Sequence, residues 1–330
     1  SRLSSLAELD AVQSACITLG IEVGLRPLKA TLAENLPQLA ILVGYSALHH
    51  ELAGFFKQLA IPVILYEVTP KQALKAVKFE EAKDRIKVAL SIHKAGSAFL
   101  RAAEIPYHYI GTPYRDRVAK VDIRASAFTF LTSKPLVTLY PGGYGEALQK
   151  MIPMFSQLAV GIHAANDCQI VVSLREELDF DQTVQEFKKY LPSTTLVSFV
   201  LGMHLELLSL SRLAVTGTGA ITIEAAIARK PFLPIYDQED EADEAGFFSL
   251  VNQSLGKKLV EEYSSQAPIK GLLTAIKNLL KEGSEHTAFL KKLEGAQSEF
   301  EGSAADNAAD FIVQVIGLGR KRSKIPVTPQ

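Results

Sequence analysis

The sequence has few cysteines, almost no net charge and no long apolar run. Its two cysteines, Cys16 and Cys168, cannot make a disulfide framework, so we expect both in the core of a protein of the reducing cytoplasm. A formal net charge of −1 gives no concentrated basic face, so nucleic acid is not an expected partner. No apolar stretch reaches the roughly twenty residues that span a bilayer, and the first residues lack the layout of a signal peptide. We therefore expect a cytoplasmic protein, peripheral to a membrane at most.

Short apolar runs alternate with longer stretches of helical periodicity. The 330 residues, 48% of them hydrophobic, exceed what one core usually serves and favour two globular domains. Strands are expected at 39–43, 63–66, 88–92, 136–140, 169–173, 196–200, 213–216 and 232–235. Helices are expected at 47–59, 73–81, 145–164, 181–190, 205–210, 222–228, 268–281 and 304–316. This alternation predicts an α/β protein of two Rossmann-like domains with parallel sheets.

The alternation pauses between residues 114 and 134, and we place the domain divide there. Residues 1–120 and 121–330 are the expected domains, and the final helix, about 304–318, is expected to pack back toward the N-terminal half. Residues 6–19 have helical periodicity, and no opening strand with a glycine turn precedes them. A first β-turn-α unit of the N-terminal domain is therefore expected to be missing.

Glycine-rich turns follow two of the expected strands of the second domain. They contain Gly142, Gly143, Gly217, Thr218 and Gly219. Each turn lets the backbone approach a ligand, and each leads into a helix N-terminus that suits phosphate, although one such turn alone can also be a ligand-free connection. Because two turns in a doubly wound domain converge on one crevice, together they favour a nucleotide site. Glu224 follows closely and either accepts bonds from ribose hydroxyls or stabilises its helix.

His49 and His50 follow an expected strand of the first domain. Adjacent histidines on a helix point in different directions, so we expect no shared metal ion. Either of them can instead be a general acid or base. Asn252 lies in an expected loop, where a lone asparagine by itself indicates only turn chemistry.

Four segments taken in order carry a resemblance to a known family. They are Gly-Thr-Pro-Tyr-Arg-Asp at 111–116, Leu-Tyr-Pro-Gly at 139–142, Ser-Arg-Leu-Ala-Val-Thr-Gly-Thr-Gly-Ala-Ile-Thr-Ile-Glu at 211–224 and Ser-Leu-Val-Asn at 249–252. In order and spacing they resemble lipid-A-disaccharide synthase. That family consists of glycosyltransferases of the GT-B fold, in which a cleft lies between two Rossmann-like domains. The likeness runs from about residue 39 to the C-terminus.

The resemblance implies a hexosyltransferase of lipid A biosynthesis, and so of lipid metabolism. It implies transfer of an acylated glucosamine from a UDP-sugar donor to a lipid monosaccharide phosphate at the inner membrane face, with release of UDP and without a metal or cofactor. The C-terminal domain would bind the nucleotide sugar and the N-terminal domain the acceptor. The implied nucleotide-binding residues are Gly142, Gly143, Tyr144, Gly217, Thr218, Gly219, Glu224 and Asn252. A homodimer is left open.

The chain departs from the resembled family at three places. Where the family has an acidic residue suited to deprotonating the acceptor, this chain offers His49 or His50 as the base. Where the family has Ser-Arg, whose guanidinium neutralises the UDP phosphates, this chain has Gly143 and Tyr144. The family's Gly-His-Pro is Gly-Thr-Pro at 111–113. These departures concern the acceptor and the phosphates.

Three hypotheses about function follow. The first is an active transferase, the second is a non-catalytic GT-B relative that acts as a binding or interaction protein, and the third is a UDP-sugar epimerase of the same fold. The basic run at 320–324 adds contact with anionic lipid as a separate hypothesis, although such a run is more often a solvated end.

Overall fold

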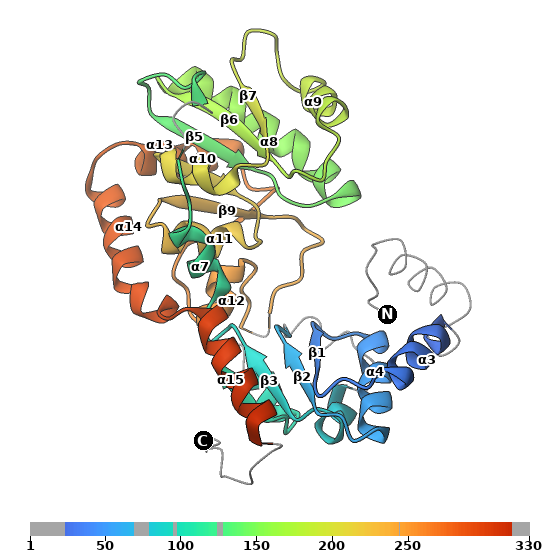
Figure 1. The fold of residues 1–330 in the computed structure, drawn as a ribbon. Helices are drawn as coiled ribbons and strands as arrows, with labels where there is room; N and C mark the ends of the chain where they lie inside the picture. The colour runs from blue at the N-terminus through green and yellow to red at the C-terminus, as the bar shows by residue number, and fades with distance from the viewer. Residues whose placement is uncertain (1–23, 69–78, 95–97, 124–127, 244, 319–330) are drawn as a thin grey trace. The chain divides into compact units, whose positions relative to one another are not determined.

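The computed structural model describes residues 24–68, 79–94, 98–123, 128–243 and 245–318 (Figure 1). The described residues divide into two compact units. Unit 1 takes in those up to Gly111 and those from Ala304 onward, and unit 2 runs from Thr112 to Ser303. Each unit has its own sheet and its own buried core. Whether these units are the two domains expected to divide after residue 120 stays a prediction.

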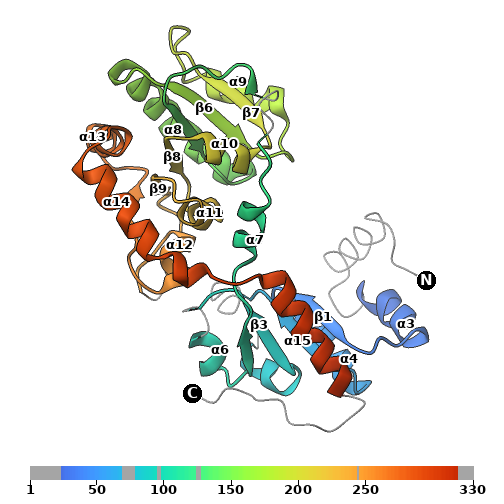
Figure 2. The same cartoon turned by 60° about the vertical axis from the view of Figure 1, so that its left-hand side comes forward.

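Unit 1 is built on a parallel sheet whose strands lie in sequence order, β1-β2-β3-β4. Its strands are β1 (Ala40–Val43), β2 (Val63–Tyr66), β3 (Val88–Ser91) and β4 (Tyr107–Tyr109). Its helices are α3 (Arg26–Glu34), α4 (Ala47–Gln58), the 3-10 helix η1 (Phe79–Asp84), α6 (Ala98–Ala102) and α15 (Ala304–Leu318). Figures 1 and 2 both draw α15 beside this sheet, where the Phe311 ring stacks on His108 with centroids 4.6 Å apart.

Unit 2 is built on a parallel sheet of six strands in the order β10-β9-β8-β5-β6-β7. Its strands are β5 (Leu136–Tyr140), β6 (Gln169–Leu174), β7 (Ser198–Leu201), β8 (Leu213–Thr216), β9 (Phe232–Tyr236) and β10 (Tyr263–Ser264). Its helices are α7 (Pro113–Ala119), α8 (Gly145–Ala165), α9 (Phe180–Lys188), α10 (His204–Leu210), α11 (Ile221–Ile227), α12 (Leu250–Leu255), α13 (Ile269–Leu280), α14 (Ser284–Gly295) and the 3-10 helix η3 (Gln297–Phe300).

Strand β5 is buried on both faces of the unit 2 sheet, which is why its sequence is apolar apart from Thr138, whose hydroxyl is hydrogen-bonded to that of Ser211. Val137 and Leu139 belong to the large core that includes side chains of α8 and α13. Leu136 points to the opposite face and packs with Leu207 of α10. Successive side chains of a strand alternate between faces, so this one strand anchors both helical layers.

The strand order of unit 2 reverses direction between β5 and β8. The chain adds β6 and β7 on one side of β5, and it then crosses over to add β8, β9 and β10 on the other side. In open parallel sheets, ligands bind outside the carboxyl ends of the strands at such a switch point. In the described part of unit 1 the strands follow one another without a reversal. The topology therefore directs attention to unit 2.

The predicted fold class is confirmed: the protein is α/β with two parallel Rossmann-like sheets. All eight predicted strands are present, and their ends differ by at most two residues from the predictions. The predictions did not include β4, β10, α3, α6, α7, α12 or α14. Cys168 is buried as predicted. The described residues include no helix long and apolar enough to cross a membrane.

Several predictions fall on residues that the structure does not describe. Cys16, the helical stretch 6–19 and the basic run 320–324 all lie outside the described ranges. Most of the predicted helix 73–81 lies outside them too, and its last described residues belong to η1.

Candidate functional site

A cavity of about 790 Å³ opens at the carboxyl ends of β5 and β8, at the switch point of unit 2. Its size is that of a small-molecule site. The sequence-predicted residues that line it are Gly142, Gly143, Gly217, Thr218, Gly219 and Glu224. Most of the predicted nucleotide-binding residues therefore come together around one cavity.

The two glycine turns are bonded to each other through the backbone. The N–H of Gly217 donates to the carbonyl oxygen of Tyr140 at 2.8 Å. A Cβ atom on Gly217 would lie 3.1 Å from the carbonyl oxygen of Pro141, so a larger residue forces the turns apart. Gly142 and Gly143 have φ angles of 66° and 73°, which glycine adopts without a steric penalty. The base of the cavity is therefore backbone that a ligand can approach closely.

Glu224 presents a buried carboxylate to this cavity from α11. Only 1% of its side chain is exposed. Arg117 Nη2 lies 3.0 Å from Oε1 of Glu224, and His204 Nε2 lies 3.5 Å from Oε2. Oε1 nevertheless accepts no hydrogen bond from the described residues. A ligand hydroxyl can satisfy this oxygen, and buried carboxylate oxygens normally have such a donor.

The cavity wall at His204 is fixed by a buried tyrosine. The Tyr140 hydroxyl donates to the backbone oxygen of His204 at 3.0 Å, and burial raises the pKa of Tyr140, so this hydroxyl stays protonated. Met203, just before α10, has a φ of 53°, which is unfavourable for a residue with a side chain. Tyr140, Met203 and His204 all line the cavity, so the start of α10 forms part of its wall.

Tyr144 precedes α8 and lies at the rim. Its side chain is 51% exposed and is not among the residues lining the cavity. Its ring packs against Arg175, whose guanidinium carbon lies 4.0 Å from the ring centre, and Arg175 does line the cavity. A second rim cation, Lys150, pairs with the carboxylates of Glu146 at 3.1 Å and Glu239 at 2.6 Å.

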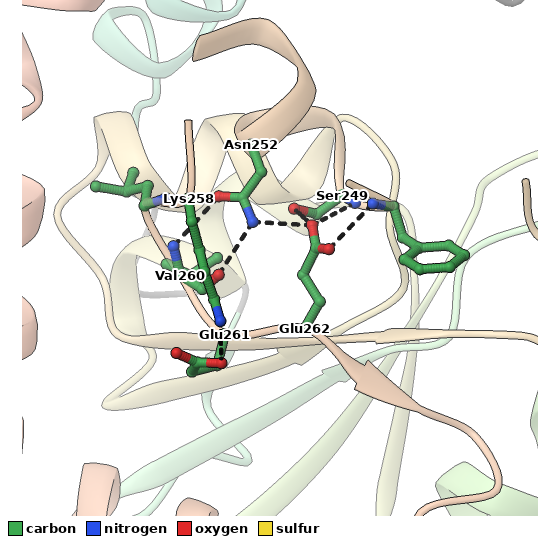
Figure 3. Close-up of polar contacts among 8 residues, drawn as sticks. Ser249, Asn252, Lys258, Val260, Glu261 and Glu262 are labelled. Carbon is green, nitrogen blue, oxygen red and sulfur yellow. Dashed lines mark hydrogen bonds and ion pairs between the residues drawn. The ribbon is translucent and has the colours of Figure 1, made fainter. Parts of the chain in front are cut away.

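Asn252 is fully buried on α12 and takes part in an internal network (Figure 3). Its Oδ1 accepts bonds from the N–H groups of Leu259 and Val260 at 2.8 and 3.2 Å. Its Nδ2 donates to the Val260 oxygen at 3.0 Å and to Oε1 of Glu262 at 2.9 Å. Glu262 also accepts from Ser249. These bonds join α12 to the segment that follows it, and Asn252 itself does not line the cavity.

The two predicted catalytic histidines lie on α4 in unit 1. His50 is buried, with Nδ1 2.9 Å from the Tyr45 hydroxyl. His49 is half-buried, with Nδ1 2.8 Å from Oγ of Ser46, and burial lowers the pKa of His49. A lowered pKa keeps the imidazole neutral near pH 7, which is the form that accepts a proton. Their catalytic role stays a prediction.

Among the cavity residues not predicted from the sequence are Arg117, Arg175 and His204. Arg175 directly follows β6, and His204 begins α10 shortly after β7. Polar residues immediately after parallel strands reach the ligand edge of a sheet, so that rule could have found both. Arg117 comes from α7, which packs on α11 within unit 2, and no local pattern indicates that contact.

Comparison with known proteins identifies relatives of this chain. The model of the family described as lipid-A-disaccharide synthetase matches residues 25–239. Lipid-A-disaccharide synthase 1 of Legionella pneumophila (strain Paris) is 26% identical over 215 residues, which are 63% of this chain and 55% of that protein. The synthase of Myxococcus xanthus is 24% identical over 310 residues, which are 90% of this chain and 80% of that protein. The chain thus spans about half the length of the Legionella relative.

Solved structures share the fold. A putative UDP-N-acetylglucosamine 2-epimerase from Listeria monocytogenes superposes with a TM-score of 0.65 at 13% identity, covering 99% of this chain and 83% of that one. An α,α-trehalose 6-phosphate synthase from Burkholderia multivorans gives 0.58 at 11% identity, covering 95% and 82%. At these identities the likeness concerns the fold alone.

Proposed function

The chain belongs to the lipid-A-disaccharide synthetase family, and on that premise we propose that it transfers a hexosyl group from a UDP-sugar to a lipid-linked sugar acceptor. In this reaction an acceptor hydroxyl oxygen attacks the anomeric carbon of the donor sugar. The bond from that carbon to UDP breaks, UDP leaves with the bonding electrons, and a base takes the hydroxyl proton. The proposed donor carries an acylated glucosamine and the proposed acceptor is a lipid monosaccharide phosphate, as the sequence resemblance implies.

The carboxylate of Glu224 is the observation that carries the proposal. It is buried at the switch-point cavity, and its Oε1 has no hydrogen-bond donor among the described residues. A ribose hydroxyl is a donor that fits this oxygen. The backbone turns at Gly142 and Gly217 lie at the same cavity and suit the phosphates, because they precede helix N-termini.

Calorimetric titration with UDP tests this assignment directly. Glu224→Gln keeps the shape of the side chain and removes its charge, so we expect UDP to bind roughly 10- to 100-fold more weakly, as for loss of a hydrogen bond to a charged group. Glu282→Gln is the matched control, because that carboxylate is 86% exposed on unit 2 and does not line the cavity. Equal affinity in the parent and in Glu224→Gln would remove Glu224 from the site.

The second candidate function is a protein that binds a nucleotide and does not turn it over. The glycine turns and Glu224 account for holding a nucleotide, and none of them is a base for the acceptor. That base would have to come from elsewhere, and His49 is our proposal because its pKa is lowered and its side chain is half-buried rather than enclosed. A product assay with donor and lipid acceptor distinguishes the two: UDP binding with no UDP release supports the non-catalytic alternative.

Membrane contact follows from the proposed acceptor. A lipid-linked sugar lies in a bilayer, so we propose a cytoplasmic enzyme peripheral to the membrane, with the basic run 320–324 near anionic lipid. Flotation with anionic vesicles, with and without that run, measures the contact. We expect removal of the run to lower the bound fraction at low salt. An unchanged fraction would assign the contact to another surface.

A further inference from the structure

Cationic side chains are scarce around the cavity. Of the described residues that line it, three carry a permanent positive charge, Arg117, Lys150 and Arg175, and carboxylates outnumber them. Arg117 is held against the buried carboxylate of Glu224 at 3.0 Å. Lys150 contacts two carboxylates, at 3.1 and 2.6 Å. The excess negative charge of the cavity opposes binding of a diphosphate. A diphosphate bound here therefore needs a cation that is not already paired closely with a carboxylate.

Arg175 lies next to the glycine turn that leads into α8. It directly follows β6, which pairs in parallel with β5, so it leaves the sheet at the same edge as that turn. Its guanidinium carbon is 4.0 Å from the ring centre of Tyr144, the residue that follows Gly143. A cation–π contact of this kind orients a guanidinium without neutralising its charge.

The other contact of Arg175 is weak. Nε and Nη2 donate to the Glu177 carboxylate at 3.4 and 3.3 Å, and that carboxylate is 54% exposed, so water weakens the pair. Within the described ranges Nη1 donates to no acceptor. A guanidinium has five N–H groups in a planar fork that matches phosphate oxygens. Arg175 therefore keeps donors for a ligand.

We propose that Arg175, oriented by the ring of Tyr144, binds the diphosphate of the donor and stabilises the negative charge of UDP as it leaves. The inference rests on the proposed UDP-sugar transfer. The guanidinium comes from the residue that follows β6, and the ring of Tyr144 orients it. The N–H groups at the start of α8 complete the phosphate site.

Titration of the full chain with UDP and with uridine tests this role. Arg175→Gln should weaken UDP binding roughly 10- to 100-fold and leave uridine binding unchanged, because only UDP has phosphates. It should also reduce the salt dependence of UDP binding. Arg101→Gln makes the same charge change on unit 1, where Arg101 donates to the Tyr107 hydroxyl and does not line the cavity, and it should match the parent.

Variants of Tyr144 and Glu177 test the positioning. Tyr144→Phe keeps the ring and should bind UDP as the parent does, whereas Tyr144→Ala should weaken UDP binding about 3-fold, as for loss of an exposed cation–π contact. Glu177→Gln frees the guanidinium and should strengthen UDP binding. In a transferase assay, Arg175→Gln should lower kcat as well as raise KM, because leaving-group charge is greatest in the transition state.

The outcomes separate the two proposals. If the parent binds UDP and Arg175→Gln binds it equally well, the role of Arg175 is overturned and the nucleotide site stands. If UDP and uridine binding weaken together, Arg175 only shapes the cavity and the phosphate role is overturned. If the parent binds neither ligand, both the proposed function and the proposed role of Arg175 are overturned. Circular dichroism and a thermal melt of each variant identify any that fail to fold. If Arg175→Gln does not fold, Arg175→Met, which also lacks the charge, replaces it with the same expected result.

Discussion

The backbone N–H of Gly217 donates a hydrogen bond to the carbonyl oxygen of Tyr140 at 2.8 Å, and so joins the ends of β8 and β5. The bond lies at the reversal of strand order and brings both glycine turns to one cavity. The backbone forms the base of the cavity. The charged side chains around it come from α7, α8, α11 and the segments that follow β6 and β9. The fold therefore positions the backbone of the proposed nucleotide site, and the surrounding side chains set its charge.

Gly217→Ala should destabilise the protein and weaken UDP binding. Its added Cβ would lie 3.1 Å from the Pro141 oxygen, which is backbone and can yield only by separating the two turns. Such overpacking costs about 1–3 kcal/mol. Gly219→Ala is the matched control, because a Cβ there meets nothing within 4 Å and should leave stability within about 0.5 kcal/mol of the parent. Urea unfolding measures both, and equal stabilities would contradict the close approach.

Asn252→Ala should act through stability rather than through a contact with UDP. The substitution leaves the buried N–H groups of Leu259 and Val260 without their acceptor and removes one of the donors to the Glu262 carboxylate, which keeps its bonds from Ser249. We expect a loss on the order of 3 kcal/mol, since each unsatisfied buried group costs about 1–3 kcal/mol. Asn278→Ala, which removes an exposed amide that donates to Glu285, should change stability by less than about 0.5 kcal/mol.

Calorimetry on the folded fraction then separates the two roles of Asn252. If UDP affinity is close to the parent value, the residue supports the fold of α12. If the variant is fully stable and loses UDP binding, the result supports the direct contact with UDP that the sequence resemblance implies, and it contradicts the structural role.

Much of the fold could be predicted from the sequence because many of its strands are buried on both faces. Such strands read as short continuous runs of Val, Ile and Leu, as in β5 and β8, and glycine turns end them. The missed elements give weaker signals. β10 has only two residues, and α7 begins at Pro113 within a charged stretch. Periodicity over so few residues does not distinguish a helix or strand from a loop.

The site was only partly predictable from the sequence. Its glycine turns directly follow strands, whereas its charged side chains meet only through tertiary packing. Gly142 and Gly217 follow their strands directly, so the sequence places them at one sheet edge. Arg117 reaches Glu224 across 107 positions of the chain (224 − 117), a pairing that depends on how α7 packs against α11. Asn252 matched a family motif, yet its four hydrogen bonds are all internal. A motif gives a residue its place in the chain and does not show which way its side chain points.

His49→Gln should abolish most of the transferase activity if His49 is the acceptor base. Loss of a general base lowers kcat by roughly 10²- to 10⁴-fold. Burial lowers the pKa of His49 from its ordinary value of 6.5. On the acid limb of the pH profile, kcat/KM of the parent should therefore fall with a midpoint below pH 6.5. His50→Gln is the comparison: it breaks the buried contact with Tyr45 and should lower stability while keeping that limb. A pH profile of His49→Gln that retains the acid limb would rule out His49.

His93 should make the protein less stable in mild acid. The side chain is 5% exposed after β3, and burial lowers the pKa of His93 to about 4. Its pKa in the unfolded chain is the ordinary value of 6.5. Between those two values the unfolded chain binds a proton that the folded protein excludes, so stability rises with pH across this window. The contribution of His93 is fully present above pH 6.5 and is lost as the pH falls toward 4.

Urea unfolding at pH 7 and pH 5 measures this effect. The His93 linkage alone should cost the parent about 2 kcal/mol between those pH values, at 1.36 kcal/mol per pKa unit. His93→Gln does not titrate, so its stability should fall by about 2 kcal/mol less over the same interval, whatever its stability at pH 7. Because the carboxylates and the other histidines titrate alike in both proteins, the difference between the two falls isolates His93. Parallel falls would show that His93 is protonated in the folded protein, and that the core around β3 admits the charge.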